Sequence, residues 1–566
     1  MNPSVRAYRA THDPDHALTP ALEALHHFGQ SRREDAVRDP AALRGLAEDV
    51  HLPVAAVRGA LSSYSEVGHD PNAIRYCAGT SCALCGGDAI AEAFRRAGPA
   101  RPVYCLGYCD RAPAAMLPNG DVVAELTPGE CAGACRGARP AASPLMSIRS
   151  IARESIVTRR LLSPPSKAMP AYVGLKAALR MTPEAVTEAV IAANLRGRGG
   201  AAFPTGKKWL FAAKAKGGPK FIVANGDEGD PGSFIDRVLM ESDPHGILEG
   251  MAIAAHAVGA ARGILFIRDE YPLAVEAMER AIAAAVVAGV LGADALGPGR
   301  DFHVEVVRGL GSYVCGEETA LLNAIEAGRG EVRPRPPFPV EEGLFGKPTV
   351  VVNVETLVNV PWIIERGAEA FRRLGTPESP GTKAICLNKG FANPGIVEIE
   401  FGMTLRELIE RGECGGGGAR GARLEAVLLG GPMGSIVTPD LWETPVCFSA
   451  MGARKINLGH AGLVAIPAPA DWAAILRHLL DFMRDESCGK CVPCRLGTTR
   501  GHELVHAGLT ADSAATLRRI LDLMGEASLC AFGRETTGPV RTVLDRFGPQ
   551  VIAGLERTAG TKEVSR

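Results

Sequence analysis

Residues 486–497 read ESCGKCVPCRLG, and their three cysteines, Cys488, Cys491 and Cys494, are each separated by two residues. A fourth cysteine, Cys530, stands alone further along the chain. Three clustered thiolates and one remote thiolate can hold the four irons of a cubane [4Fe–4S] cluster. Zinc sites usually collect their ligands as two pairs, so structural zinc is one alternative, and buried free cysteines are the other. The motif therefore predicts an iron–sulfur domain near the C-terminus.

A second group of cysteines lies in the first quarter of the chain. Two pairs follow two predicted strands that flank a helix over residues 88–96, so the pairs can meet at one end of a small sheet. Four thiolates in two pairs suit a [2Fe–2S] cluster, and paired cysteines are equally the habit of zinc. The predicted ligands are Cys77, Cys82, Cys105 and Cys109. Cys85, Cys131 and Cys135 fall outside this pattern, and we assign them no role.

The composition of the 566 residues excludes several function classes. Lys and Arg number 62 and Asp and Glu 63, so a net charge of -1 gives no electrostatic footprint for nucleic acid. No uninterrupted apolar run reaches the about 18 residues of a membrane span, and the first 30 residues lack the layout of a signal peptide. Clustered cysteines in a reducing compartment are metal ligands more often than disulfides. We therefore expect a cytoplasmic protein that is not inserted into a membrane.

The pattern of apolar residues divides the chain into several units. A helical segment includes a predicted helix over residues 18–28, and the small cysteine domain, a Ser/Pro/Arg-rich linker, an α/β domain, a smaller mixed domain and a helical cysteine domain follow. The predicted boundaries are 1–70, 71–140, 141–175, 176–375, 380–467 and 468–566.

A basic, glycine-rich loop opens the α/β domain. Residues 196–208 read RGRGGAAFPTGKK, and a backbone without side chains can place its N–H groups on a phosphate, with Arg198, Lys207 and Lys208 adding charge. The loop is not a Walker A motif, because Lys208 stands where Ser or Thr is needed. A surface turn is the alternative interpretation of the loop taken alone.

Two further segments add carboxylates. Residues 225–232 read NGDEGDPG directly after a predicted strand, and residues 311–319 read GSYVCGEET at the start of a helix. Carboxylates and an amide can hydrogen-bond the hydroxyls of a ribityl chain or a ribose, and Gly316 permits close approach to an aromatic ring system. The three segments together predict a nucleotide site.

At this point the chain resembles a known family. The blocks RGRGGAAFPTGKKW, NGDEGDPGSF, GSYVCGEETALLNAIE, GLFGKPTVVVNVETL and ESCGKCVPCRLG resemble the NADH-binding flavoprotein of respiratory complex I. They also resemble the diaphorase subunits of NAD-dependent formate dehydrogenases and NAD-reducing hydrogenases. The segments CAGTSC and CLGYCDRAPAAM resemble the small ferredoxin partner of that flavoprotein, so two subunits of the family look fused.

The resemblance implies a multidomain α/β fold. Its parts would be a helical N-terminal segment, a thioredoxin-like [2Fe–2S] domain, a non-classical FMN- and NAD-binding α/β domain, a β-grasp-like domain and a helical [4Fe–4S] domain. It also implies roles for residues of this chain. FMN would be surrounded by Gly197, Arg198, Gly199, Gly200, Asn225, Asp227, Glu228, Gly316, Glu317, Asn353 and Thr356. NAD(H) would be contacted by Phe203, Lys208, Phe211, Asp230, Glu318 and Phe338, with Tyr313 lining the same site.

The implied activity is that of a diaphorase subunit, in which NAD(H) exchanges a hydride with FMN and iron–sulfur clusters carry single electrons. Glu318 is the candidate for positioning the flavin and nicotinamide, and the acids at 230 and 318 favour NADH over NADPH. We expect the [4Fe–4S] cluster to be the first acceptor, with the other cluster beyond the linker. The chain departs from the complex I pattern at Ala202, Asp230, Arg335 and Val352.

The second substrate must react on a partner subunit, because nothing here binds molybdenum, tungsten, nickel or quinone. The NGDEGDPG segment and the complete ferredoxin domain favour the β subunit of a cytoplasmic NAD-dependent formate dehydrogenase. The alternatives are an NAD-reducing hydrogenase and complex I. An alternative of another class is a non-catalytic iron–sulfur scaffold.

Overall fold

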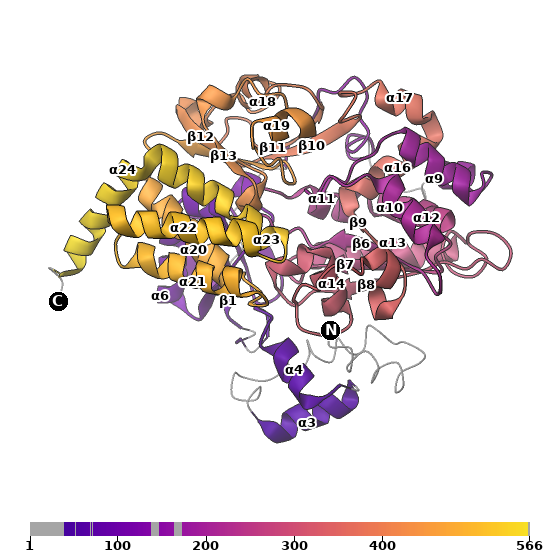
Figure 1. Cartoon of the computed structure of the whole chain (residues 1–566), viewed down its shortest axis with the longest axis horizontal. Coiled ribbons are helices and arrows are strands. Elements are labelled where there is room, and N and C mark those ends of the chain that lie inside the picture. The colour runs from indigo at the N-terminus through magenta and orange to yellow at the C-terminus, as the bar shows by residue number, and fades with distance from the viewer. Residues whose placement is uncertain are drawn as a thin grey trace.

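The computed structural model describes residues 39–563, apart from 51, 68, 71, 137–145 and 164–171, and beyond residue 555 it describes the backbone only. The helix predicted over 18–28 lies outside the described residues. Three sheets and a helical bundle organise the part that is described (Figure 1). We call these units the first domain (72–136), the α/β domain (172–375), the mixed-sheet domain (146–163 and 376–470) and the helical domain (471–563).

The first domain is a four-stranded sheet with two helices. The strand order is β2-β1-β3-β4, with β1 parallel to β2 and antiparallel to β3. Helices α6 and α7 pack against each other, and Phe94 of α6 is fully buried in the core of this domain. The elements are β1 (Ile74–Cys77), α5 (Thr80–Leu84), α6 (Gly87–Ala97), β2 (Ala100–Val103), β3 (Ala114–Met116), β4 (Val122–Ala124) and α7 (Pro128–Cys135).

The α/β domain is built on a parallel sheet of order β8-β7-β6-β9. The chain moves outward from β6 through β7 to β8 and then returns to place β9 on the other side of β6, so the strand order reverses between β6 and β9. The strands are β6 (Phe221–Gly226), β7 (Arg262–Ile267), β8 (His303–Arg308) and β9 (Thr349–Asn353). The helices are α8 (Val173–Ala178), α9 (Pro183–Ala192), α10 (Thr205–Lys214), α11 (Ile235–Ser242), α12 (Pro244–Val258), α13 (Pro272–Val287), α14 (Glu318–Ile325), α15 (Pro339–Glu342), α16 (Val354–Arg366) and α17 (Ala368–Arg372).

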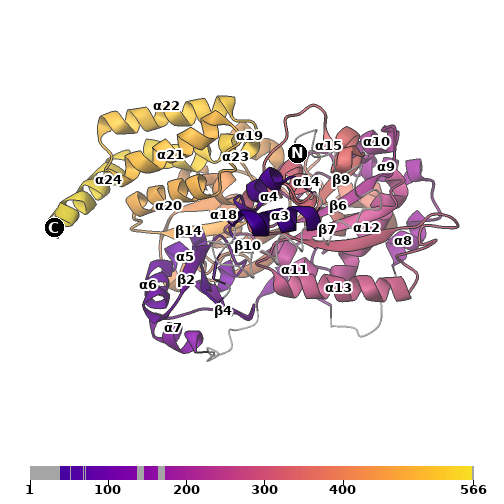
Figure 2. The ribbon, with the colours of Figure 1, turned by 90° about the horizontal axis from the view of Figure 1, so that it is seen from below.

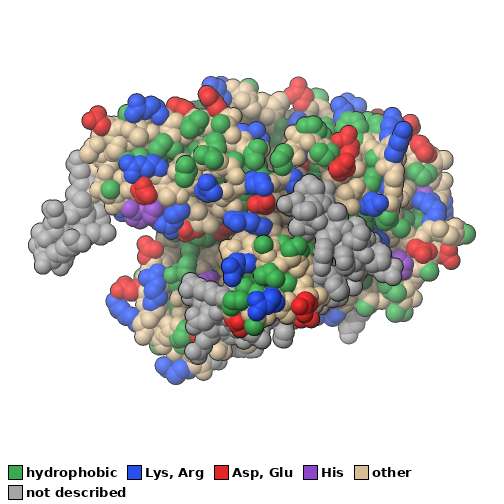
Figure 3. Space-filling view, turned by 60° about the horizontal axis from the view of Figure 1, so that its bottom comes forward, with side chains coloured by type: hydrophobic (Ala, Val, Ile, Leu, Met, Phe, Trp, Pro, Cys, Tyr) green, Lys and Arg blue, Asp and Glu red, His purple; other side chains and the backbone are tan. Residues whose placement is uncertain are grey.

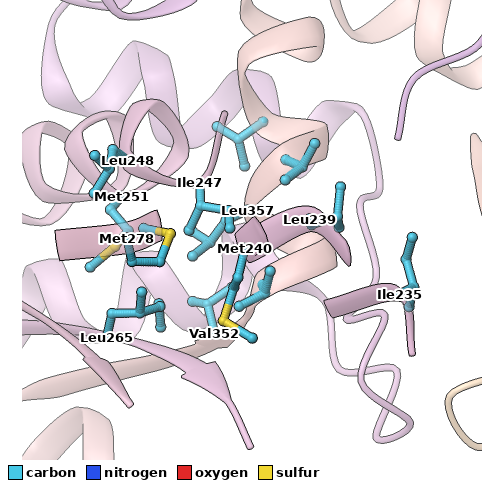
Figure 4. Close-up of a cluster of buried hydrophobic side chains, with 14 of the residues drawn as sticks. Ile235, Leu239, Met240, Ile247, Leu248, Met251, Leu265, Met278, Val352 and Leu357 are labelled. Carbon is cyan, nitrogen blue, oxygen red and sulfur yellow. The ribbon is translucent and has the colours of Figure 1, made fainter. Parts of the chain in front are cut away.

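Both faces of this sheet are buried. Alternate residues of each strand point to opposite sides, so each strand contributes to two cores. Leu265 and Val352 face a core that includes Met240, Met251 and Leu357 from helices α11, α12 and α16 (Figure 4). The opposite residues of the same strands form a second core with α14 and with the N-terminal helices α3 (Pro40–Asp49) and α4 (Val54–Leu61), which lie beside α14 in Figure 2. The N-terminal helices therefore share the hydrophobic core on one side of the α/β-domain sheet.

The mixed-sheet domain has the strand order β13-β12-β14-β10-β11-β5. Its elements are β5 (Ile148–Ser150), β10 (Thr382–Leu387), β11 (Gly395–Glu400), α18 (Leu405–Glu410), β12 (Leu424–Leu429), β13 (Ser435–Val437), α19 (Phe448–Ala453) and β14 (Leu463–Pro467).

Strand β5 corrects the predicted linker over 141–175. The segment 146–163 contains the edge strand β5, which runs parallel to β11, and Ile156 and Val157 further along it are fully buried. The carboxylate of Glu398 in β11 accepts hydrogen bonds from the amides of Ile156, Val157 and Thr158 at 2.8–2.9 Å. This described part of the predicted linker is therefore a component of the mixed-sheet domain.

The helical domain consists of α20 (Trp472–Asp485), α21 (Val492–His506), α22 (Ala511–Ala527), α23 (Ala531–Glu535) and α24 (Thr537–Glu563). Trp472 stacks on Phe547 at a ring separation of 3.7 Å, which joins the first and last of these helices. The loop between α20 and α21 carries Cys488 and Cys491, and Cys530 caps α23.

Basic and acidic side chains are interspersed over the face drawn in Figure 3. Among the described residues, no helix combines the length and the apolar character that a membrane crossing needs.

Candidate functional site

The predicted nucleotide residues gather where the strand order of the parallel sheet reverses. Asn225 at the end of β6 and Asn353 at the end of β9 are paired residues in neighbouring parallel strands. In parallel α/β sheets the crevice beyond the carboxyl ends of the strands, at the point of reversal, is where ligands bind. The N-terminus of α16 opens at the same place, with Asn353 as its capping residue, and a helix N-terminus favours an anion.

The glycine-rich loop lies against this crevice. A side chain at Gly199 would come within 3.0 Å of the Asn353 side chain, and Gly200 has a φ of +113°, so both positions require glycine. The amide of Arg198 donates to Thr356 Oγ1 at 2.8 Å, and the amide of Gly197 donates to the carbonyl of Phe203 at 3.0 Å. The loop is thus tied both to itself and to α16, which fixes its glycine backbone beside the N-terminus of that helix.

The Arg198 side chain corrects one prediction. Its guanidinium is buried under the loop, donates to the carbonyl of Pro380 at 3.1 Å and stacks over Phe401 at 4.8 Å. Burial lowers the pKa of Arg198 to about 10. Arg198 therefore fixes the loop on the mixed-sheet domain and offers its charge there rather than to a phosphate.

Glu228 also has a different environment from the predicted one. Its carboxylate is buried and accepts hydrogen bonds from Ser233 Oγ at 2.6 Å and from the amides of Asp236 and Arg237 at 3.1 and 3.0 Å. These are the first residues of α11, so Glu228 acts as a helix cap. Burial raises the pKa of the neighbouring Asp227, whose carboxylate lies 3.9 Å from the Arg268 guanidinium.

The GSYVCGEET segment closes the crevice from the other side. The carbonyl of Gly316 accepts a hydrogen bond from Asn225 Nδ2 at 2.9 Å, and a side chain at Gly316 would lie 3.2 Å from the carbonyl of Asp227. Glu317 caps α14 through the amides of Thr319 and Ala320. Gly316 therefore presents backbone without a side chain beside Asn225. Glu317 fixes this segment by capping α14.

Glu318 is held between two cations. Its carboxylate accepts from Lys208 Nζ at 2.7 Å and from Arg335 Nη1 at 3.0 Å. Burial opposes the charged form, but the pairs with Lys208 and Arg335 outweigh it and lower the pKa of Glu318. The carboxylate of Glu318 is therefore ionised at neutral pH, and Lys208 and Arg335 balance its charge.

Three aromatic side chains are exposed at the surface of the α/β domain. Phe203, Phe211 and Phe338 are 47%, 51% and 49% exposed, whereas most phenylalanines of the described chain are buried. Phe203 precedes α10, Phe211 lies on it, and α10 packs against α15, which follows Phe338. Exposed aromatic rings next to a polar crevice can stack on a planar base.

His460 is a residue that sequence reasoning missed. Tyr313 donates its hydroxyl hydrogen bond to Asp230, and His460 Nε2 lies 3.7 Å from the other oxygen of that carboxylate. The amide of Gly462 donates to His460 Nδ1 at 3.0 Å, so the second ring nitrogen carries the proton and faces Asp230. Burial lowers the pKa of His460, which keeps the ring neutral. In the sequence, the one signal near His460 is the pair of glycines Gly459 and Gly462, which permit other parts of the chain to approach the backbone closely.

The first cysteine quartet lies directly against the nucleotide domain. Cys105 and Cys109 Sγ are 3.5 Å apart, and the amide of Gly232, in the NGDEGDPG segment, donates to Cys109 Sγ at 3.3 Å. A side chain at Gly79 would lie 3.4 Å from Cys105 Sγ and 3.5 Å from Cys77 Sγ. The hydrogen bond with Cys105 and then burial raise the pKa of Cys109 well above its usual value. The expectation that this quartet lies beyond a linker is therefore wrong.

The second quartet gathers in the helical domain. Cys494 and Cys530 are buried in one small core with Tyr313, Phe482 and Phe532, and Cys488 and Cys491 pack against it. Burial raises the pKa of Cys494 to about 12 and that of Cys530 to about 11. Thiols so buried become thiolates only when a metal compensates their charge.

The spacing of the sulfur atoms favours clusters over single ions. Four sulfurs on one zinc ion would lie about 3.8 Å apart. Among the described residues, the one group of three or more possible ligand atoms within 4.8 Å of one another is Asp481, His502 and His506, and no cysteine belongs to it. In neither quartet do three sulfurs therefore lie within 4.8 Å of one another, although Cys105 and Cys109 form a close pair at 3.5 Å.

Fold and site together define an electron-transfer flavoprotein with two iron–sulfur domains. Three family models match the chain: the Nuo51 FMN-binding domain over 190–362, the NADH-ubiquinone oxidoreductase-F iron-sulfur binding region over 474–554, and the thioredoxin-like [2Fe-2S] ferredoxin over 11–139. The glycine cradle, the reversal crevice and the two sulfur quartets fit these cofactors.

Relatives cover the flavoprotein part. The chain is 40% identical over 394 residues to the NADP-reducing hydrogenase subunit HndC of Solidesulfovibrio fructosivorans, covering 69% of this chain and 80% of that one. It is 37% identical over 373 residues to the mitochondrial NADH dehydrogenase [ubiquinone] flavoprotein 1 of Dictyostelium discoideum, covering 65% and 78%. A crystal structure of an NAD+-reducing [NiFe]-hydrogenase in the H2-reduced state matches with a TM-score of 0.82 and 29% identity, covering 97% of both chains.

The chain belongs to the family of NADH-binding flavoproteins that includes NADH dehydrogenase [ubiquinone] flavoprotein 1. Its cofactors are FMN, a [2Fe–2S] cluster and a [4Fe–4S] cluster, and its nucleotide substrate is NAD(H).

Proposed function

We propose that this chain is the NAD(H)-reacting subunit of a cytoplasmic formate dehydrogenase and that the residues described above hold its cofactors. FMN would be cradled by the glycine loop from Gly197 to Gly200, Asn225, Gly316 and the N-terminus of α16, because glycine backbone, an amide side chain and a helix N-terminus meet where the strand order reverses. When bound, FMN exchanges a hydride with nicotinamide and single electrons with iron–sulfur clusters.

The chain itself supplies orientation and charge around the substrate. Phe203, Phe211 and Phe338 offer exposed rings for adenine stacking. Glu318, ionised and fixed by Lys208 and Arg335, faces a ribose better than a 2′-phosphate, which it would repel. These contacts support NADH as the preferred nucleotide.

The cysteine quartets are the proposed cluster ligands, and both are connected to the nucleotide site through short contacts. Gly232 reaches Cys109 through its amide. The amide of Tyr313 donates to Glu486 Oε2 at 2.8 Å, two residues before Cys488. Both quartets therefore approach the nucleotide site at the segment around Asp230, because Tyr313 donates its hydroxyl hydrogen bond to Asp230, two residues before Gly232.

Formate as the second substrate rests on the sequence. The NGDEGDPG segment and the fused domain with all four cysteines resemble the β subunit of NAD-dependent formate dehydrogenases. A partner subunit with a molybdenum or tungsten cofactor and further iron–sulfur clusters would carry out that reaction.

An NAD-reducing hydrogenase is the second candidate. The observation that favours it is the match of 97% of this chain to a chain of a solved NAD+-reducing [NiFe]-hydrogenase, which includes the ferredoxin part. In that case the partner would contain nickel.

Purification of the complex through this chain separates the two candidates. We expect molybdenum or tungsten to co-purify, and formate to reduce NAD+ while H2 does not. Nickel with H2-dependent reduction of NAD+ would replace formate dehydrogenase by the hydrogenase.

The scaffold alternative is tested on the chain alone. Acid extraction should release about one FMN per folded chain, and NADH should reduce an artificial dye. Folded protein that contains no flavin and reduces no dye would establish the scaffold instead.

A further inference from the structure

Two histidines and an aspartate meet on the surface of the helical domain. His502 and His506 lie one turn apart on α21, and Asp481 lies on the neighbouring helix α20. Asp481 Oδ1 is 2.7 Å from His502 Nδ1 and 2.8 Å from His506 Nε2, and the two imidazole rings are 4.2 Å apart. All three potential ligand atoms lie within 4.8 Å of one another.

We propose that Asp481, His502 and His506 bind one divalent first-row transition-metal ion, with Zn2+ as the best fit and water as the remaining ligand. Two imidazole nitrogens and one carboxylate oxygen form a donor set that suits zinc. Ligand atoms about 2.0–2.1 Å from a tetrahedral ion lie roughly 3.3 Å apart. The present contacts of 2.7 and 2.8 Å need to open by about half an ångström, which side-chain rotation provides.

Histidines at positions i and i+4 project from the same face of a helix, so α21 presents both rings without any strain on its backbone. The three side chains are between 21% and 39% exposed, so an ion can enter from solvent. The site uses neither quartet of cysteines and does not depend on the proposed function.

One cation competes for the same place. Arg484 Nη1 lies 2.6 Å from His502 Nε2, and a bound metal would repel this guanidinium. Arg484 has a second partner, because its Nε and Nη2 reach Asp485 Oδ1 at 2.7 and 2.6 Å. The guanidinium can therefore turn to Asp485 when the ion binds.

The bound ion would fasten two helices that serve the clusters. Helix α20 leads into Cys488, and α21 carries Cys494. Helix α20 also contacts the first domain, since His478 Nε2 lies 2.9 Å from Thr80 Oγ1 and Phe482 packs edge-on against Tyr104. A metal bridge between α20 and α21 would stiffen the support of both cysteine quartets.

The test uses the purified full chain with FMN and both clusters in place. Equilibrium dialysis against Zn2+ at micromolar concentration measures the zinc that binds, and zinc-edge X-ray absorption identifies its ligands. We expect one zinc per chain with nitrogen and oxygen ligands, and a zinc-dependent rise in the melting temperature. His506→Asn and Asp481→Asn should each weaken binding by at least about tenfold, on the order of the loss seen when even outer-shell partners of a metal are removed.

Glu503→Gln is the matched control, because Glu503 is an exposed acid on the same helix that pairs with Arg500. It should bind zinc as the unmodified chain does. Equal binding by all four proteins, or bound zinc with sulfur ligands only, would overturn the proposal. An unmodified chain that takes up no zinc under these conditions would overturn it as well.

Discussion

At the scale of single residues, we propose that the ion pairs of Glu318 control which nucleotide the crevice accepts. Replacing this carboxylate by an amide in Glu318→Gln leaves Lys208 without its carboxylate partner and Arg335 with Glu317 alone, at 3.7 Å, next to the proposed ribose position. We predict that the ratio of kcat/KM for NADPH to that for NADH rises about tenfold, equivalent to about 1.4 kcal/mol. Dye-reduction kinetics with both nucleotides measure this ratio.

Glu342→Gln is the control for this change, since Glu342 is an exposed acid on α15, near Phe338. Its ratio should stay at the unmodified value. An unchanged ratio in Glu318→Gln would show that this carboxylate does not face the substrate ribose.

Thr356 connects the glycine loop to α16 through a single hydroxyl group. In Thr356→Val the buried amide of Arg198 loses its acceptor, which costs about 1 kcal/mol or more. Because the loop forms one wall of the crevice, we predict that FMN binds about fivefold more weakly. Flavin fluorescence on dilution measures the released FMN.

Thr356→Ser keeps the hydroxyl and should bind FMN as the unmodified chain does. If Thr356→Val and Thr356→Ser held FMN equally tightly, the hydroxyl would play no part in shaping the loop.

The sequence predicted glycine and cysteine positions better than the directions of long side chains. Gly199 and Gly200 are needed for local reasons, namely close approach to Asn353 and a positive φ, and such reasons are visible in a motif. Arg198 turns away from the predicted site to stack on Phe401, which is distant in the sequence. Glu228 turns away to cap α11, whose position depends on the path of the folded chain. His460 could not be predicted as a site residue either, because its partner Asp230 is distant in the sequence.

At the scale of elements, the carboxylate of Glu398 holds the segment 146–163 on the mixed-sheet domain. It accepts three backbone amides and the hydroxyls of Thr158 and Thr382. In Glu398→Gln an amide group faces donors, so two or more hydrogen bonds are lost. We predict a decrease of about 2–3 kcal/mol in the free energy of unfolding, measured by denaturant titration.

Limited proteolysis provides a second reading, because the variant should be cut within 146–163 sooner than the unmodified chain. Glu410→Gln, an exposed acid on α18, should change neither stability nor cutting. A Glu398→Gln protein as stable as this control would contradict the structural role.

Strand β5 could not be predicted, because three residues are too short to show an alternating pattern and its pairing partner is far along the chain. The apolar pattern of the sequence predicts longer elements well: it indicates helices over 247–259 and 273–286 and strands over 220–224 and 263–267, which lie close to α12, α13, β6 and β7. Their apolar residues repeat with the period of a helix or form buried runs, and both signals are local. Strand β9 carries the motif residue Asn353 but was not predicted as a strand.

At the scale of the whole molecule, the two cysteine quartets should load independently. They lie in different domains, and one contacts Gly232 while the other packs against Tyr313. The unmodified chain should contain about six irons, and Cys491→Ser should contain about two, by the stoichiometry of the clusters. Iron and acid-labile sulfide analysis of the folded proteins measures this difference.

In Cys491→Ser we also expect FMN content and NADH-dependent dye reduction to persist, while transfer to the partner subunit slows. Loss of FMN together with the irons would show that the helical domain and the crevice form one folding unit. Normal transfer to the partner would mean that the second quartet is structural.

The edge strand β5 has a consequence for synthesis of the chain. Arg149 donates a hydrogen bond to the carbonyl of Pro394, 245 residues later, so the whole α/β domain is made after β5 and before the other five strands of that sheet. At about 5–20 residues per second, β5 waits roughly 12–50 s on the ribosome before its neighbour exists. Its three residues and the charge of Arg149 offer little template for wrong pairing during that interval. The α/β domain is in effect an insertion in the mixed-sheet domain. It is joined to that domain at both of its ends, so a single cut of the chain cannot release it.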